Sequence, residues 1–259
     1  MIDIHSHILY GVDDGPRTLG ESLELAAEAT ANGIRQIIAT PHHKNGVYDN
    51  PKQSVLELVE EFQRELDRQQ IPLTVYPGQE VHVYDSILED IHNHELLTLD
   101  KHHKYLLLEL PNDSVPPFME ELLYDIQLLG VTPIIPHPER NVAIRKRPSM
   151  LYQMIRKGAL AQITAASVVG KFGKGIQKFS FQCIEHNLCH MIASDAHKAG
   201  KRGFHLQDAY KVIRKKFGID VEHQLLRNTE WMMNGVDMYV NPPQKIERKS
   251  TLATLLKRK

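Results

Sequence analysis

Cysteine is scarce in this sequence. The 259 residues include only two cysteines, Cys183 and Cys189. Two cysteines do not make a disulfide framework, which is typical of a reducing compartment, and we expect a cytoplasmic protein. A thiolate phosphatase needs an arginine six positions after its cysteine to close a phosphate-binding loop, but Cys189 and Asp195 occupy those two positions. The sequence therefore excludes that chemistry, and both cysteines are predicted to be core residues.

Long apolar runs and an excess of one charge are absent too. No run approaches the roughly 18 residues that a transmembrane helix requires, so we predict no membrane span. The formal net charge is −1, from 31 Lys and Arg against 32 Asp and Glu. This balance gives no general attraction to nucleic acid or to an anionic membrane, and we expect neither as a partner. We also expect no cleaved signal peptide, because cleavage would remove His5, a candidate ligand.

Seven strand-like segments alternate with helical segments along the chain. The strand-like runs lie at 1–7, 34–40, 73–76, 105–110, 132–136, 160–164 and 190–193. Helical patterns lie at 18–33, 50–68, 85–92, 116–129, 149–157, 174–185, 206–217, 221–226 and 228–233. Repeated βα units without a linker predict a single α/β domain, a closed TIM-like barrel, over residues 1–240. Residues 241–259 carry six Lys or Arg and one Glu and are expected to form a basic tail.

The first strand carries two histidines on one face. In Ile2-Asp3-Ile4-His5-Ser6-His7 apolar and polar residues alternate, and successive side chains of a strand point to opposite faces. His5 and His7 therefore leave the same face, at the point where the strand ends. Two imidazoles placed in this way make half of a metal site, so the ends of the other strands decide whether the site is complete.

Histidines and carboxylates also follow the later strands. The active site of such a barrel lies at the carboxyl ends of its strands, and six of the seven predicted ends carry residue types that bind metals. The candidates are His5, His7, His42, Glu80, Glu109, His137, Asp195 and His197, with Asp13 and Asp14 in the loop after the first strand. This number exceeds the needs of one ion and predicts two or three, with Glu80 as the bridging carboxylate. Mixed imidazole and carboxylate ligands suit Mn, Fe or Zn.

Two arginines lie close to these ligands in the sequence. Arg140 comes three residues after His137, and Arg202 comes five residues after His197. A planar guanidinium pairs with two phosphoryl oxygens and stabilises the charge that develops on them. Metal ions about 3.5–4 Å apart activate a hydroxide for in-line displacement. The metal ligands alone indicate hydrolysis of a phosphoester or an amide, and the arginines favour the phosphoester.

These motifs resemble those of the polymerase and histidinol phosphatase (PHP) superfamily. The narrower resemblance is to the manganese-dependent bacterial protein tyrosine phosphatases of capsule and exopolysaccharide loci, and it extends from Met1 to about Gly235. It rests on Asp3-Ile4-His5-Ser6-His7-Ile8-Leu9, Gly11-Val12-Asp13-Asp14-Gly15, Ala39-Thr40-Pro41-His42-His43, His137-Pro138-Glu139-Arg140-Asn141 and Ser194-Asp195-Ala196-His197. Tyr10 departs from the pattern, which has proline at this position.

The resemblance implies a distorted (β/α)7 barrel, the PHP fold, with three metal ions and Mn2+ as the expected metal. One ion would be held by His5, His7, Glu80 and Asp195, a second by Glu80, Glu109 and His137, and a third by Asp14, His42 and His197. Arg140 and Arg202 match the positions that hold the phosphoryl group. The implied partner is a phosphotyrosine protein, the tail of a bacterial tyrosine kinase that controls polysaccharide export.

The resulting hypothesis is a protein-tyrosine phosphatase in which a metal-bound hydroxide attacks phosphorus and tyrosine departs. The alternatives are a histidinol-phosphate or other small-metabolite phosphatase, a PHP-type exonuclease and a non-catalytic protein stabilised by metal. The near-neutral charge disfavours the exonuclease, because a nucleic-acid backbone requires a basic surface. A metal-dependent amidohydrolase commonly has a bridging lysine at the fourth strand, where this chain has Glu109.

Overall fold

The computed structural model of the protein describes residues 1–247. Most of the predicted basic tail, residues 248–259, lies outside the described residues. Residues 241–247 run along the end of one helix of the barrel, because Gln244 N donates to His186 O at 2.8 Å and Asn187 Nδ2 donates to Pro242 O at 2.9 Å. The first part of the predicted tail is therefore held against the domain.

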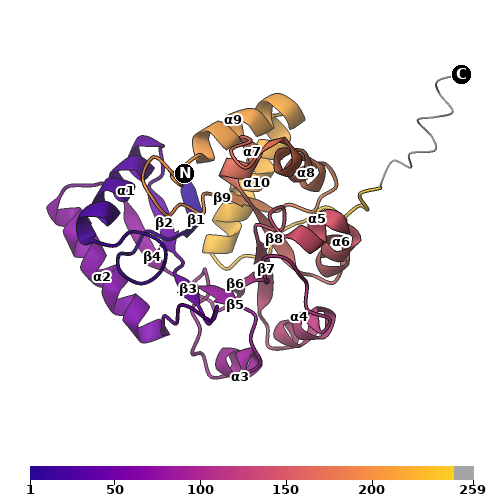
Figure 1. Ribbon diagram of the computed structural model, residues 1–259, viewed down its shortest axis with the longest axis horizontal. Helices are drawn as coiled ribbons and strands as arrows, with labels where there is room; N and C mark the ends of the chain where they lie inside the picture. The colour runs from indigo at the N-terminus through magenta and orange to yellow at the C-terminus, as the bar shows by residue number, and fades with distance from the viewer. Residues whose placement is uncertain (248–259) are drawn as a thin grey trace, which may run out of the picture.

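The strands form two parallel sheets that share one barrel (Figure 1). The smaller sheet has the order β1 (Ile2–Ser6), β2 (Gln36–Ala39) and β4 (Thr74–Pro77). The larger has the order β3 (His42–His43), β5 (Glu80–His82), β6 (Tyr105–Glu109), β7 (Thr132–Pro136), β8 (Leu160–Thr164) and β9 (Met191–Ala193). β9 returns to β1, where His7 N donates to Ala196 O at 2.8 Å and Asp195 N donates to His5 O at 2.9 Å. The predicted single-domain, distorted α/β barrel is confirmed.

The distortion arises after two of the seven predicted strands, 34–40 and 73–76, each of which is followed by a short additional strand. β2 and β3 are separated at Pro41, which has no N–H to continue the ladder. β4 and β5 are separated at Gly78, where a Cβ atom would lie 2.7 Å from Cγ2 of Ile38. Only glycine permits this close approach of the backbone at residue 78 to Ile38 of β2. The short strands after the breaks carry His42 and Glu80, so the breaks set where these two candidate ligands lie.

Helices surround the strands (Figure 1). They are α1 (Leu19–Ala31), α2 (Lys52–Arg68), α3 (Ile87–His92), α4 (Met119–Leu128), α5 (Val142–Lys146), α6 (Ser149–Arg156), α7 (Ala165–Val168), α8 (Lys174–Glu185), α9 (Leu206–Phe217) and α10 (Ile219–Met233). The sequence did not predict α5 and α7, which are too short to show a helical period. It also predicted two helices where α10 is continuous, because no glycine or proline interrupts this segment. α10 places the fully buried Met232 against Ile4 and Met191 of the strands.

His190, just before β9, is a buried histidine that is not among the predicted metal ligands. Its Nδ1 accepts a hydrogen bond from Ala161 N at 3.0 Å, and burial lowers the pKa of His190 from 6.5 to about 4. The unfolded chain therefore binds a proton between these two pH values that the folded protein does not bind. The resulting stabilisation of the fold is fully present above pH 6.5, decreases as the pH falls below that value and is lost once the pH has fallen through about 4.

We expect His190→Asn to reduce the loss of stability on acidification. The Asn oxygen can accept the same Ala161 N–H but does not titrate, so the variant should lose about 3 kcal/mol less unfolding free energy than the native protein between pH 7 and pH 4. Urea unfolding of both proteins at the two pH values measures this difference. Identical losses would show that His190 does not contribute to the pH dependence.

None of the helices within residues 1–247 combines the length and the hydropathy of a membrane span.

Candidate metal centre

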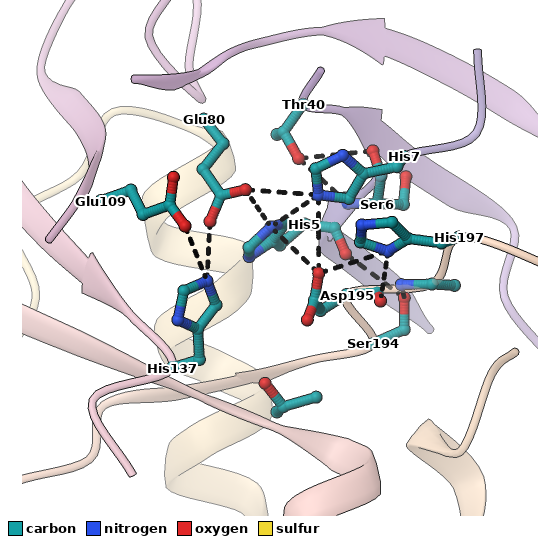
Figure 2. Close-up of polar contacts among 12 residues, drawn as sticks. His5, Ser6, His7, Thr40, Glu80, Glu109, His137, Ser194, Asp195 and His197 are labelled. Carbon is teal, nitrogen blue, oxygen red and sulfur yellow. Dashed lines mark hydrogen bonds and ion pairs between the residues drawn. The ribbon is translucent and has the colours of Figure 1, made fainter. Parts of the chain in front are cut away.

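The nine predicted ligands meet at one end of the barrel. Figure 2 shows His5, His7, Glu80, Glu109, His137, Asp195 and His197 among them. Glu80, at the start of β5, lies at their centre. Its Oε2 is 3.3 Å from Nε2 of His5, 3.3 Å from Nε2 of His7 and 3.0 Å from Nδ1 of His42. Its Oε1 is 2.8 Å from Nε2 of His137. One carboxylate thus faces four imidazoles from three strand ends, those of β1, β3 and β7, which is the position that a bridging ligand requires.

The remaining candidates extend this network on both sides of Glu80. On one side Glu109 is 3.6 Å from His42 and 3.9 Å from His137. On the other side Asp14 is 3.1 Å from Nε2 of His197 and 3.5 Å from Nε2 of His42. Asp195 Oδ1 lies 3.5–3.6 Å from nitrogens of His5, His7 and His197. The structure therefore brings all nine predicted residues into one cluster.

Three groups in this cluster have ligand atoms close enough to share an ion. They are His5, His7 and Glu80; His42, Glu80 and Glu109; and His7, Asp14, His42 and His197. The first group has three of the four residues predicted for it and lacks Asp195, and the third has its three predicted residues together with His7. The second differs, because His42 stands near Glu80 and Glu109 where the resemblance placed His137. His137 still contacts Glu80 directly, at 2.8 Å.

Two of the predicted ligands have an unusual backbone. His137 follows β7 with a φ of 36°, and Asp195 follows β9 with a φ of 53°. Non-glycine residues rarely adopt such left-handed conformations, and those that do are concentrated at functional sites. Here the backbone of both is held by a neighbouring strand, because His137 N donates to Gln162 O and Asp195 N donates to His5 O. The turn at each strand end thus fixes the direction of the ligand.

Opposite charges shift the titration of the whole cluster. Burial opposes protonation of His5 and His7, but Glu80 raises the pKa of the first and Asp13 raises the pKa of the second. Burial also opposes protonation of His42, but Glu109 and Glu80 raise its pKa to about 10. Burial opposes ionisation of Glu80, yet His5 and His137 hold its pKa well below the usual value. The carboxylates therefore favour positive charge at His5, His7 and His42, and divalent ions can replace those protons.

The donor atoms themselves fit metal ions. Glu80 Oε2 and His42 Nδ1 are buried, lie 3.0 Å apart and have no hydrogen bond among the described residues. A buried carboxylate oxygen without a donor is unfavourable by several kcal/mol unless a cation binds it. Imidazole and carboxylate together are the ligands of Mn, Fe and Zn. We conclude that the residues present suit a centre of more than one ion.

Two residues support the histidines: Asp13, a candidate that the resemblance assigned to none of the three ions, and Gln162, which the sequence did not predict. Asp13 Oδ2 accepts a hydrogen bond from Nδ1 of His7 at 2.7 Å, and Gln162 Oε1 accepts one from Nδ1 of His5 at 2.9 Å. Both bonds orient the imidazole and leave its Nε2 facing Glu80. The sequence did place Asp13 beside Asp14, but Gln162 lies in β8, at the one strand end without a ligand. A buried glutamine in an apolar strand was the available signal.

We expect Asp13→Asn to weaken metal binding without unfolding the protein. Asparagine keeps the volume of the side chain but loses the charge that orients His7, and such outer partners commonly affect metal affinity about 10- to 100-fold. Competition with a fluorescent chelator measures the affinity. Asp49→Asn is a matched control, because Asp49 lies 3.1 Å from His43, which is not a ligand. Equal affinities of the two variants would contradict this role of Asp13.

Arg140 and Arg202 reach the cluster from two loops. Arg140 Nη1 donates to Asp195 Oδ2, and Arg202 Nη2 lies 3.5 Å from the same oxygen. Arg202 Nη1 also donates to Asp14 Oδ2 at 3.3 Å. Burial opposes ionisation of Asp195, yet Arg140 holds its pKa well below the usual value. Two guanidinium groups therefore flank one edge of the centre, as the sequence predicts.

The two cysteines lie outside this site and are buried. Burial raises the pKa of both Cys183 and Cys189, so that neither forms a thiolate at neutral pH. This agrees with the exclusion of thiolate chemistry.

Fold and site together define a class, the α/β-barrel hydrolases with histidine and carboxylate clusters suited to metal ions. A β-aspartyl dipeptidase of Fervidobacterium islandicum has a similar fold: it is 12% identical, with 95% of this chain and 76% of the dipeptidase chain aligned at a TM-score of 0.51.

Within this class the sequence identifies the family. The family model described as "Capsular polysaccharide synthesis, CpsB/CapC" matches residues 1–234, and the chain belongs to this family. The tyrosine-protein phosphatase YwqE of Bacillus subtilis is 45% identical over 96% of this chain and 98% of its own. The tyrosine-protein phosphatase CpsB of Streptococcus pneumoniae is 33% identical over 84% of this chain and 91% of its own.

A solved structure agrees with the family assignment. It comes from work on YwqE of Bacillus subtilis and CpsB of Streptococcus pneumoniae, described as "unique metal-dependent tyrosine phosphatases". That chain is 44% identical and aligns at a TM-score of 0.92 with 96% of this chain and 100% of its own. The predicted resemblance to capsule-type tyrosine phosphatases is confirmed.

Proposed function

We propose that this protein is a metal-dependent protein-tyrosine phosphatase. The observation that supports this function most strongly is the pair of arginines beside the cluster. Arg140 and Arg202 both contact Asp195. Asp195 in turn lies 3.5–3.6 Å from His5 and His7, which surround Glu80. Guanidinium groups next to a metal centre suit a substrate with several anionic oxygens, which is a phosphoryl group rather than an amide.

The nine clustered residues would hold two or three ions, with Mn2+ as our proposal and Fe or Zn as the other metals that these ligands suit. When bound, such ions lower the pKa of a coordinated water and offset the charge of the phosphoryl oxygens. Glu80 would bridge the ions, and Asp13 and Gln162 would keep His7 and His5 in the required orientation.

Arg140 and Arg202 would hold the phosphoryl group in line for displacement. Their planar groups donate two hydrogen bonds each toward equatorial oxygens, and this stabilisation grows as charge accumulates on those oxygens. Tyrosine has a pKa near 10 and leaves more readily than an aliphatic alcohol. The reaction on phosphotyrosine therefore depends less on a strong general acid, and no such residue is assigned.

The proposed substrate is phosphotyrosine on a bacterial tyrosine kinase that regulates capsule or exopolysaccharide synthesis. The family description and the names of the relatives support this choice. We propose that the protein acts in the cytoplasm, that residues 1–240 form the catalytic barrel and that residues 241–259 are an appended tail. A small-metabolite phosphatase or an exonuclease is not favoured by these relatives.

The test is phosphate release by protein stripped of metal and reconstituted with Mn, Zn or Mg. The substrates are a phosphotyrosine peptide, a phosphoserine peptide, histidinol phosphate and a short oligonucleotide. The proposal predicts metal-dependent hydrolysis of the phosphotyrosine peptide above all others. Preference for histidinol phosphate or the oligonucleotide would overturn the substrate class, and absence of turnover with every metal would overturn the enzymatic function.

A further inference from the structure

Phe172 exposes an aromatic ring in the loop between α7 and α8. Phe172 is 38% exposed, although phenylalanine is usually buried. The loop reads Gly170-Lys171-Phe172-Gly173, and it follows β8 at the same end of the barrel as the metal ligands. An exposed aromatic side chain on a loop beside a reaction site commonly contacts a ligand.

The neighbour of this ring is the guanidinium group that we assign to the phosphoryl group. Arg140 Cζ lies over the ring of Phe172, 5.7 Å from its centroid. The same guanidinium donates to Asp195 and retains 24% exposure of its side chain. Phe172, Arg140 and the metal ligand Asp195 therefore follow one another from the rim of the site to its centre.

The loop is built to present the ring in one position. Gly170 and Gly173 have φ values of 85° and 92°, conformations that are costly for other residues. Gln177 of α8 ties the loop down, because its Nε2 donates to Val168 O at 2.9 Å. A side chain already held in place loses little conformational entropy when a ligand binds against it.

We propose that Phe172 contacts the aromatic ring of the substrate and so selects aryl phosphates over alkyl phosphates. This inference rests on the proposed function of the site. In phosphotyrosine a single oxygen separates phosphorus from the ring, so a phosphoryl group held by Arg140 brings the substrate ring to the next apolar surface outward. The exposed aromatic ring that contacts Arg140 is that of Phe172. Phosphoserine and phosphorylated polar metabolites have no ring for this contact and would gain nothing from it.

The experiment compares Phe172→Ala, Phe172→Leu and Phe172→Tyr with the native protein, all reconstituted with Mn2+. Benzylphosphonate and methylphosphonate serve as probes, because they share the phosphonate but differ in the ring and neither can be hydrolysed. Titration calorimetry measures both affinities, and steady-state kinetics gives KM for a phosphotyrosine peptide. Tyr124→Ala, on the outer face of α4 and 60% exposed, controls for loss of an exposed aromatic elsewhere.

We expect Phe172→Ala to weaken benzylphosphonate binding and to raise KM for the peptide by about tenfold, with methylphosphonate binding changed less than about twofold. Phe172→Tyr should keep the native affinity and KM, and Phe172→Leu should have values between those of the native protein and Phe172→Ala. The metal content and the melting temperature of all three variants should equal those of the native protein. Equal weakening of both phosphonates would overturn the proposal and show that Phe172 positions Arg140. Unchanged binding of both would overturn it as well.

The native protein separates these failures from failure of the proposed function. If it hydrolyses the phosphotyrosine peptide but the variants bind both phosphonates as it does, only the role of Phe172 is wrong. If the native protein hydrolyses no aryl phosphate with any metal, the proposed function itself is wrong.

Discussion

Replacing Glu80 by glutamine is expected to abolish metal binding and activity while leaving the barrel folded. Glutamine has the shape of glutamate, but its amide is neutral and presents N–H groups where two ions need oxygen. The carboxylate of Glu80 lies within 3.3 Å of nitrogens of four imidazoles, so its loss affects every group in the centre at once. We expect turnover to fall by more than about a thousandfold.

Metal content by mass spectrometry and phosphate release from a phosphotyrosine peptide check this prediction together. Glu120→Gln is the matched control, because it makes the same isosteric change away from the site. Glu120 lies at the surface, where its Oε2 is 2.5 Å from Nζ of Lys157. Its turnover should equal that of the native protein. A Glu80→Gln protein that retained its metal ions and its activity would contradict the bridging role.

Replacing Arg140 by alanine is expected to reduce catalysis without removing the metal. Arg140 carries no metal ligand atom, but it contacts Asp195 and faces the proposed phosphoryl position. Loss of a group that stabilises charge in the transition state commonly lowers kcat about 10²- to 10³-fold, and we expect a fall in kcat/KM of this size. Arg140→Lys should recover only part of it, because lysine cannot donate two parallel hydrogen bonds.

Steady-state kinetics and metal analysis of the same preparations separate the two roles of Arg140. Arg156→Ala provides the control, because Arg156 lies over Tyr152 on α6 and contacts no ligand. If Arg140→Ala loses its metal along with its activity, the arginine serves the metal centre rather than the substrate. Full activity in this variant would remove the main support for a phosphoryl substrate.

The positions of the ligands could be predicted because a parallel barrel places all its strand ends together. His5 and His7 are marked by the alternation of the first strand, and Asp195 and His197 repeat the same spacing after the last. These four needed only the period of a strand and the polarity of the barrel. The seven-unit barrel itself followed from the regular alternation of strand-like and helical segments.

Contacts between distant segments could not be predicted in the same way. Gln162 reaches His5 across 157 positions of the chain, and no local pattern marks that pairing. The break at Gly78 depends on the approach of Ile38 from another strand. The grouping of His42 with Glu80 and Glu109 likewise depends on how the short strands β3 and β5 turn after their breaks. Residue types and spacing indicate the candidate ligands, whereas packing decides which of them lie close enough to share an ion.

The central claim is that one cluster around Glu80 holds the catalytic metal ions. Anomalous X-ray scattering at the manganese edge, from crystals of the Mn2+-reconstituted protein, tests it most directly. We predict two or three manganese peaks among the nine predicted ligands. Two of these peaks should lie next to the Glu80 carboxylate, one on each side of it. Manganese peaks located elsewhere, or none within reach of His5, Glu80 and His197, would contradict the account.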